Sequence, residues 1–230
     1  MSKPPEEGPG ADNPGSADAA GQTRRRVIPR DAASLVLFRL GSRGPEVLMG
    51  RRHHALRFMP GVLVFPGGRV DREDYRAPAL SELAPATRRM LEHRARPSLA
   101  RALAVAAARE LHEETALVLG EMQADRVVPD LGCMDYLSRA ITPAGRPIRF
   151  HARFLVAPAE ASRGEIHGSG ELEELRFFAL PELEGQPVMR VTALMLEEFQ
   201  RWLSLDPQAR AERRLNAVMG RDRWSEERLG

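Results

Sequence analysis

The stretch from Leu99 to Val118 contains neither proline nor glycine, and it constrains the fold more than any other part of the chain. It is rich in alanine, leucine and glutamate, which favour helix, and Ser98 just before it is a suitable N-cap. On such a helix Glu110, Glu113 and Glu114 stand at i, i+3 and i+4, so their carboxylates share one face. We therefore expect a fold built around a helix that carries three clustered acids.

Two interpretations of this acidic face stay open from the residues alone. Exposed like charges cost only about a few tenths of a kcal/mol each, so a solvated face needs no metal. Two buried carboxylates about 5 Å apart would repel by about 3 kcal/mol, which a divalent cation would remove. Ala106 and Ala107 are small enough for a loop to pack beside the acids. The glycine turn at Gly67-Gly68 is the candidate loop, because glycine lets the backbone approach a ligand.

Elsewhere the chain alternates apolar runs with turn residues, which predicts several strands and further helices. Further helices are expected over 86–94, over 131–140 and, with clear amphipathic spacing, over 192–203. The expected strands are Ala33–Leu40, Glu46–Met49, Val62–Phe65, Arg149–Val156 and Glu174–Ala179.

The domain organisation follows from composition. Residues 1–25 hold proline, glycine, alanine and aspartate with almost no large apolar side chain, so we expect a disordered tail. One domain is expected over 26–205, with a polar, proline-broken insertion at about 72–97. Residues 206–230 form a charged C-terminal extension in which further helix is expected.

The balance of basic and acidic residues and the single cysteine limit which partners and which compartment we expect. The 34 lysines and arginines nearly balance the 32 acids, which argues against nucleic acid as the main partner. The single cysteine, Cys133, excludes an intrachain disulfide and suits a reducing compartment, so a cytoplasmic location is expected. No apolar run is long enough for a membrane span, so no membrane partner is expected, and a homodimer is left open.

The glycine turn and the acidic helix together resemble the Nudix box. Gly68 matches its first glycine, and Arg109-Glu110-Leu111-His112-Glu113-Glu114 matches its specific second half. Ala116 stands where the box has its last glycine, so the helix either ends there, at a cost of about 1 kcal/mol, or continues to Gly120. The box is also interrupted by the insertion. Its first glutamate has no obvious counterpart, and Asp71 or Glu73 are the substitutes considered.

The interruption points to one branch of the family. Three segments are similar to the acyl-CoA diphosphatase branch, which carries such an insertion: 58–68, 141–143 and 149–154. One departure is His151-Ala152, where that branch has Asp-Thr, so substrate recognition is expected to differ.

The resemblance implies a Nudix fold, which is an α/β/α sandwich around a mixed β-sheet, and roles for particular residues. Glu113, Glu114 and the Gly68 carbonyl would bind Mg²⁺ or Mn²⁺, and Glu110 would be a ligand or the water-activating base. Arg109 would orient these glutamates, and Glu171 or Glu174 would add a later acid. Phosphates of the substrate would be contacted by Arg51, Arg52 and Arg57.

The expected activity is hydrolysis of a diphosphate in a small molecule, with CoA or acyl-CoA as the first candidate. Dinucleotides and nucleoside-diphosphate sugars such as NADH and ADP-ribose are the enzymatic alternative. A catalytically silent Nudix module that binds a ligand is the alternative from another class.

Overall fold

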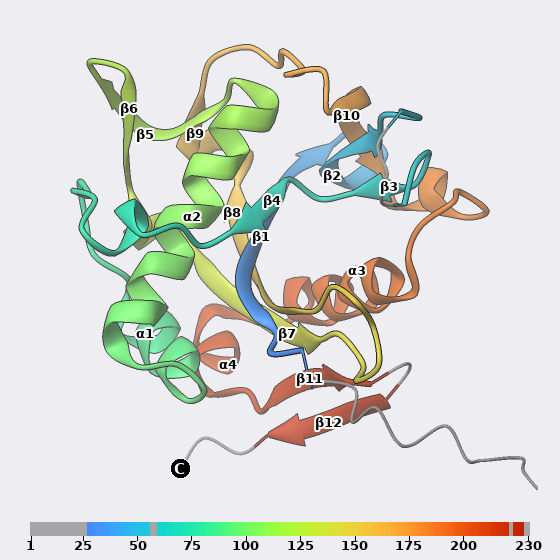
Figure 1. Cartoon of the computed structure of the whole chain (residues 1–230). Helices are drawn as coiled ribbons and strands as arrows, with labels where there is room; N and C mark the ends of the chain where they lie inside the picture. Colours follow the sequence, from blue (N-terminus) through green and yellow to red (C-terminus); the bar gives the residue numbers. More distant parts are fainter. Residues whose placement is uncertain (1–26, 56–58, 221–222, 228–230) are drawn as a thin grey trace, which may run out of the picture.

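The computed structural model describes residues 27–55, 59–220 and 223–227 (Figure 1). The tail expected over residues 1–25 and the expected substrate contact Arg57 therefore lie outside the described residues.

A nine-stranded mixed sheet forms the centre of the molecule. At its middle, β1 (Arg30–Gly41) pairs in parallel with β8 (Phe150–Pro158) and in antiparallel fashion with β2 (Gly44–Arg52). The order along the sheet is β10-β2-β1-β8-β7-β11-β12, with β3 added to β2 and β4 added to β1. The other bounds are β3 Leu63–Val64, β4 Gly67–Arg69, β7 Asp135–Ile141, β10 Leu172–Ala179, β11 Leu215–Met219 and β12 Arg223–Glu227.

Helices cover both faces of this sheet (Figure 1). Leu35 and Leu37 of β1 pack in one core with α2 (Pro97–Thr115), whereas Val36 packs in a second core with α3 (Arg190–Leu203). This alternation follows from the two-residue period of a strand. The expected α/β/α sandwich around a mixed sheet is confirmed, and so is the amphipathic helix expected over 192–203.

A smaller sheet lies beyond the end of α2. It has the order β6-β5-β9, with bounds β5 Val118–Gln123, β6 Arg126–Pro129 and β9 Ser162–Arg163. The β5–β6 hairpin projects beside α2 (Figure 1). Short 3-10 helices occur at η1 Glu73–Tyr75, η2 Leu131–Cys133, η3 Ala159–Ala161 and η4 Leu180–Leu183.

The helix expected over 131–140 is wrong. Only η2 is helical there, and Asp135–Ile141 form strand β7 between β8 and β11. Tyr136 packs into the core beside α2 and Leu137 into the core beside α3. This opposite burial of neighbours is the pattern of a strand, and pairing with β8 outweighs local helix preference.

The insertion and the C-terminal segment contact each other. Helix α1 (Pro85–Glu92) confirms the short helix expected there, and the Arg89 side chain donates to the carbonyl of Ala211 at 2.7 Å. After α4 (Pro207–Glu212) the chain adds β11 and β12 to the central sheet instead of continuing as helix. No helix within the described ranges is both long and apolar enough to cross a membrane.

Candidate active site

Helix α2 begins and ends with residues that fix its length. Pro97 occupies the first turn after Arg96, so the N-cap expected at Ser98 lies inside the helix; proline suits this position because the first N–H groups have no intrahelical partner. At the other end Ala116 adopts φ 62° and donates its N–H to the His112 carbonyl at 2.8 Å. The helix therefore ends at the box position, as the first of the two expected alternatives.

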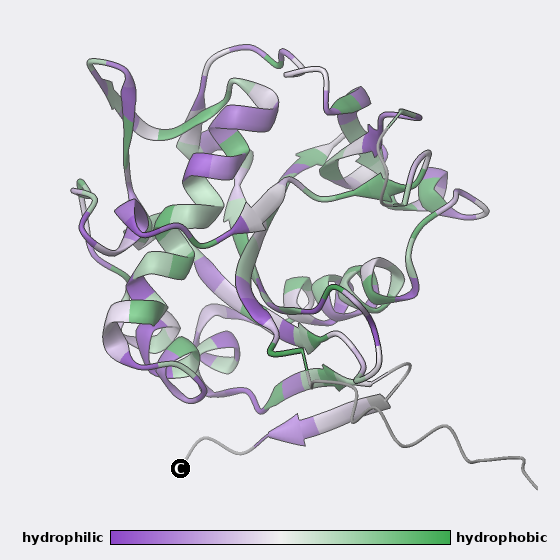
Figure 2. Cartoon of the chain, in the orientation of Figure 1, coloured by the Kyte–Doolittle hydropathy of each residue, from purple (hydrophilic) through white to green (hydrophobic). Residues whose placement is uncertain are grey.

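The glycine turn lies directly against the acidic face of α2. A Cβ built on Gly68 would overlap the carboxylate of Glu110, so only glycine fits there with this side-chain position. The N–H of Gly67 donates to Glu114 at 3.0 Å. Figure 2 shows the last turns of α2 as hydrophilic, in contrast to the apolar strands behind them. The predicted approach of the turn to the glutamates is confirmed by these contacts.

Arg109 joins the glutamates to a buried carboxylate that the sequence interpretation missed. Its guanidinium donates to both oxygens of Asp74 at 3.0 and 3.2 Å, to Glu110 at 2.9 Å and to Glu113 at 2.8 Å. Asp74 is 1% exposed, in η1.

Asp74, rather than the candidates Asp71 and Glu73, is therefore the acid that holds Arg109 through two hydrogen bonds. The carboxylate of Asp71 lies 3.9 Å from Arg109, half exposed, while its backbone N–H donates to Asp74 at 2.7 Å. Five residues separate Gly68 from Asp74, which is the spacing of the box between its first glycine and its first glutamate, so this spacing was the signal that could have found Asp74.

Burial dominates the electrostatics of the two inner glutamates. Desolvation raises the pKa of Glu114 to about 8, with further repulsion from Glu110 and Glu171, although the Gly67 N–H opposes the shift. Desolvation also raises the pKa of Glu110, and Arg109 opposes that shift. Glu113 keeps about half of its side chain exposed, at 52%. The two inner carboxyl groups are thus poorly solvated, and a cation would stabilise their charged forms.

The structure separates the two later acids. Glu171 precedes β10, and its charge acts on Glu114. Glu174 sits in a register irregularity of β10 with φ 46° and accepts from Arg51 at 2.8 Å. Only Glu171 of this pair is linked electrostatically to the acidic helix face.

Arg51 and Arg52, which were expected to contact phosphate, also differ from each other in their surroundings. Besides Glu174, Arg51 donates to the carbonyl of Gly61 at 3.0 Å and to Gln186 at 3.1 Å, so it holds three segments together. Arg52 exerts its charge on Glu114 and lies beside the acidic face.

The oxygen donors of the α2 glutamates and of Gly68 are of the kind that bind a hard divalent cation. They are not, however, arranged around a common point at which a metal ion would lie. Across residues 27–55, 59–220 and 223–227, no group of three or more His, Cys, Asp or Glu is arranged to hold a metal ion. Glu110 and Glu113 instead bind Arg109, and Glu114 binds Gly67. Oxygen donors are nevertheless what Mg²⁺ and Mn²⁺ prefer, and the poorly solvated Glu110 and Glu114 beside bare backbone at Gly68 suit such an ion.

No protein-family model matches this chain, and no curated protein matches it. It is similar to the solved structure of a NUDIX hydrolase from Alicyclobacillus acidocaldarius, with 25% identity, a TM-score of 0.56 and coverage of 74% of this chain and 91% of that one.

A second similar structure is the NUDIX domain of Shewanella oneidensis NrtR complexed with ADP ribose. Identity is 16%, the TM-score is 0.50, and 81% of this chain and 96% of that chain are covered. The chain thus has the fold of the Nudix hydrolases, and its similarity to the Alicyclobacillus structure supports a Nudix-type hydrolase.

Proposed function

We propose that this chain hydrolyses the diphosphate linkage of a nucleoside diphosphate joined to another group, with Mg²⁺ or Mn²⁺ as cofactor and CoA or acyl-CoA as substrate. The observation that carries the proposal is the cluster of Glu110, Glu113 and Glu114 that Arg109 and the Gly67-Gly68 turn hold together. The CoA assignment rests on the resemblance of the interrupted box and its flanking segments.

Each residue of the cluster has a separate task. Glu113, Glu114 and the carbonyl of Gly68 would hold the metal, with Glu171 as the later acid, because its charge already reaches Glu114. Arg109 orients Glu110 and Glu113 through hydrogen bonds of 2.9 and 2.8 Å. Arg52 is the phosphate contact nearest to this face, whereas Arg51 positions the strand end that bears Glu174.

Hydrolysis of the diphosphate needs an activated water and a stabilised leaving phosphate. A divalent cation held by Glu113, Glu114 and the Gly68 carbonyl would neutralise the diphosphate and lower the pKa of a water molecule bound to it. Glu110 would accept the water proton, and desolvation, which raises the pKa of its carboxyl, makes it a stronger base than an exposed glutamate. The bond between the attacked phosphorus and the bridging oxygen breaks, and two phosphate monoesters leave.

The test is hydrolysis of a substrate panel with and without Mg²⁺ by the wild-type chain and two variants. Glu113→Gln should abolish metal-dependent turnover and leave the fold intact, because the side chain is half exposed and outside the core. Glu121→Gln, an exposed residue of β5, is the matched control and should keep full activity. Unchanged turnover in Glu113→Gln would remove this site assignment.

A second candidate substrate class is favoured by one comparison. The similar NUDIX domain of NrtR was solved with ADP ribose, so ADP-ribose and NADH belong in the panel beside CoA and acyl-CoA. Faster hydrolysis of either would move the assignment to nucleoside-diphosphate sugars or dinucleotides. Binding of these compounds with no turnover of any would favour a silent ligand-binding module.

A further inference from the structure

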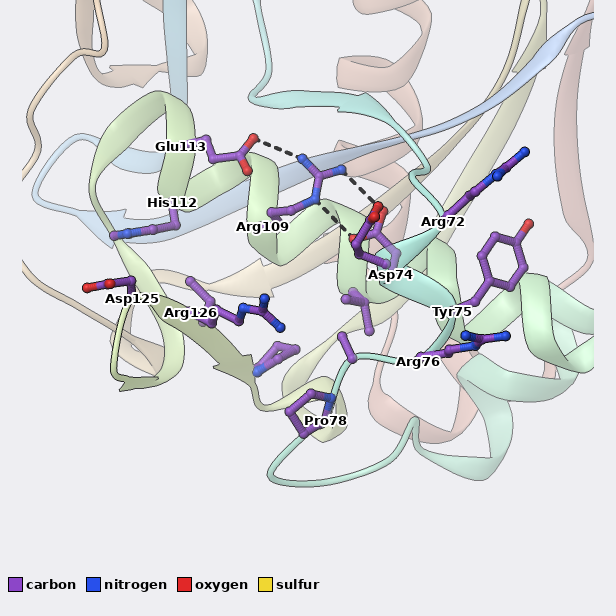
Figure 3. Close-up of a pocket in the computed structure, with 15 residues that line it drawn as sticks. Arg72, Asp74, Tyr75, Arg76, Pro78, Arg109, His112, Glu113, Asp125 and Arg126 are labelled. Atoms are coloured by element: carbon purple, nitrogen blue, oxygen red, sulfur yellow. Dashed lines mark hydrogen bonds and ion pairs between the residues drawn. The ribbon is translucent and has the colours of Figure 1, made fainter.

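Residues 72–82, which connect the glycine turn to α1, carry the carboxylate that holds Arg109. The first part of this connecting segment, residues 72–78, lines a cleft of about 880 Å³, which α2 and the β5–β6 hairpin also line (Figure 3). The segment meets the hairpin further on, where the N–H of Leu80 donates to the carbonyl of Pro129 at 2.8 Å. Before that point the cleft separates the two, so the position of residues 72–78 depends on contacts on the side of α2.

Two arginines of α2 bind the connecting segment at separate places. Arg109 donates to the carboxylate of Asp74 at 3.0 and 3.2 Å. Arg101 donates to the carbonyl of Ala77 at 2.8 Å and to both carboxylate oxygens of Glu82 at 3.0 and 3.1 Å. The two arginines lie on the same side of the helix and about 12 Å apart along its axis, because eight positions make slightly more than two turns. The segment is thus held along α2 at both ends of its course.

Asp74 occupies a turn that is too short to fix its own orientation. The 3-10 helix η1 comprises only Glu73–Tyr75, and within the segment the N–H of Asp71 donates to the Asp74 carboxylate at 2.7 Å. In Figure 3 the Asp74 carboxylate meets the guanidinium of Arg109. The other labelled side chains of this turn point away from Arg109: Arg72, Tyr75 and Arg76. A rotation of the turn by one position would therefore take the carboxylate away from Arg109.

Arg101 restrains the backbone immediately after this turn. Two residues separate Asp74 from Ala77, the residue whose carbonyl Arg101 binds. Successive Cα atoms are only about 3.8 Å apart, so a displacement of Ala77 is passed on to Asp74. The ion pair of Arg101 with Glu82 contributes little to stability, because the Glu82 side chain is 53% exposed. Its main consequence is that the Arg101 guanidinium, 26% exposed, keeps one orientation towards Ala77.

We propose that Arg101 is a positioning residue for the diphosphatase reaction. By binding the Ala77 carbonyl, it keeps η1 in the orientation in which Asp74 faces Arg109. Arg109 in turn donates to two of the α2 glutamates, at 2.9 and 2.8 Å. This inference rests on the proposed function, and it assigns to the start of the insertion the task of fixing the geometry of those glutamates.

Steady-state kinetics of Arg101→Gln, with the substrate of the panel that wild type hydrolyses fastest, test this role. The variant should lower kcat on the order of tenfold, as expected for a group that supports metal ligands. KM should stay within about twofold, because the contacts with substrate are kept, and the urea midpoint should stay near that of wild type. Arg89→Gln removes an exposed arginine that donates to the Ala211 carbonyl, and as the matched control it should keep full kcat. Wild-type kcat in Arg101→Gln overturns the inference.

A double-mutant cycle with Asp74→Asn separates positioning from an independent effect on stability. If Arg101 acts through Asp74, adding Arg101→Gln to the Asp74→Asn chain should lower kcat by less than about twofold, because residues in one network are not additive. A loss in the Asp74→Asn chain as large as the loss in wild type would show that Arg101 acts by another route, and would overturn the inference.

A measurement without turnover separates this inference from the proposed function. NMR of the full chain in EDTA follows exchange of the Arg109 Nε–H, which donates to Asp74 at 3.0 Å and is assigned by its absence in Arg109→Lys. Its exchange should be at least about tenfold faster in Arg101→Gln, since the contact opens more often, and unchanged in Arg89→Gln. That result supports the positioning role even if no diphosphate is hydrolysed. Equal exchange in wild type and Arg101→Gln overturns it even if a diphosphate is hydrolysed.

Discussion

The guanidinium of Arg109 is held by the buried carboxylate of Asp74 through two hydrogen bonds, of 3.0 and 3.2 Å, across 35 positions of sequence. Burial alone would lower the pKa of Arg109, but the Asp74 hydrogen bond and the charges of Glu110, Asp74 and Glu113 raise it. Arg109 therefore stays charged and keeps a fixed orientation towards Glu110 and Glu113.

Asp74→Asn should weaken both activity and stability. It leaves the partly buried Arg109 without its innermost anion, and loss of such a supporting group typically lowers activity by about 10–100-fold. The free energy of unfolding should fall by about 2 kcal/mol, less than for a fully buried pair because Arg109 is 23% exposed. Steady-state kinetics and urea denaturation measure the two effects. Asp71→Asn is the control, and a larger loss there would show that Asp71 supports Arg109 instead.

The metal-free chain should lose stability as the pH rises. Glu114 has its pKa raised from an ordinary 4.5 to about 8, so the folded state binds a proton more tightly than the unfolded state. This contribution is fully present below pH 4.5 and is lost as the pH rises to about 8, at about 1.4 kcal/mol per pKa unit.

Urea denaturation in EDTA between pH 5 and 8 checks this slope, with Glu114→Gln as the matched variant. The variant should show a flatter dependence on pH, because it has no carboxyl to deprotonate. Adding Mg²⁺ should stabilise the wild type more at the upper end of the range, since metal binds the deprotonated ligand. Identical slopes in the two proteins would contradict the shift at Glu114.

Ala116→Gly should stabilise the chain by up to about 1 kcal/mol, because Ala116 holds φ 62° at the end of α2 and glycine adopts this conformation freely. Thermal unfolding gives the change, and activity should be unaffected since the backbone position is kept. Ala116→Val, which is branched at Cβ, should have the opposite sign. A stabilised valine variant would be incompatible with the left-handed conformation.

Glu227→Gln should destabilise the chain by about 3 kcal/mol, the cost of leaving a buried charge unpaired. Glu227 of β12 pairs with Arg139, which is 5% exposed. His151 does not supply a second charge there, because desolvation, Arg153 and Arg139 lower its pKa to about 3 and keep it neutral. The neighbouring Glu226→Gln breaks only the exposed pair with Arg214 and should cost at most about 0.5 kcal/mol. Similar unfolding midpoints for both variants would show that the buried pair contributes little.

Local patterns in the sequence predicted the parts of the site that depend on local structure. The helix expected over 99–118, which runs from Pro97 to Thr115, follows from its composition. The glycine turn was expected to approach the glutamates because glycine has no side chain, and Gly68 does lie against Glu110. Asp74 was missed because three acids lie within four positions, and η1 decides which of them turns inward. The strand at 135–141 was missed because its stability comes from pairing with distant β8.

The same limit applies to Glu171 and Glu174. Both are acids before the same apolar run, and their spacing does not distinguish them. The register irregularity in β10 and the hydrogen bond from Arg51 fix the position of Glu174. Neither feature can be read from the local sequence pattern. Sequence reasoning therefore named the segment and left open which of its two acids lies nearer the acidic face of α2.

The Asp74–Arg109 contact also closes the chain segment between them, whose ends it fixes while the interior holds α1. For a segment closed in this way, doubling its length costs only about 0.6 kcal/mol of chain entropy. The turn after α1, where Arg94 and Arg96 are exposed and Ala95 is partly buried, is therefore a natural graft point for protein engineering. A fluorescent reporter domain spliced there would precede α2 directly, while Asp74 and Arg109 on either side kept their places.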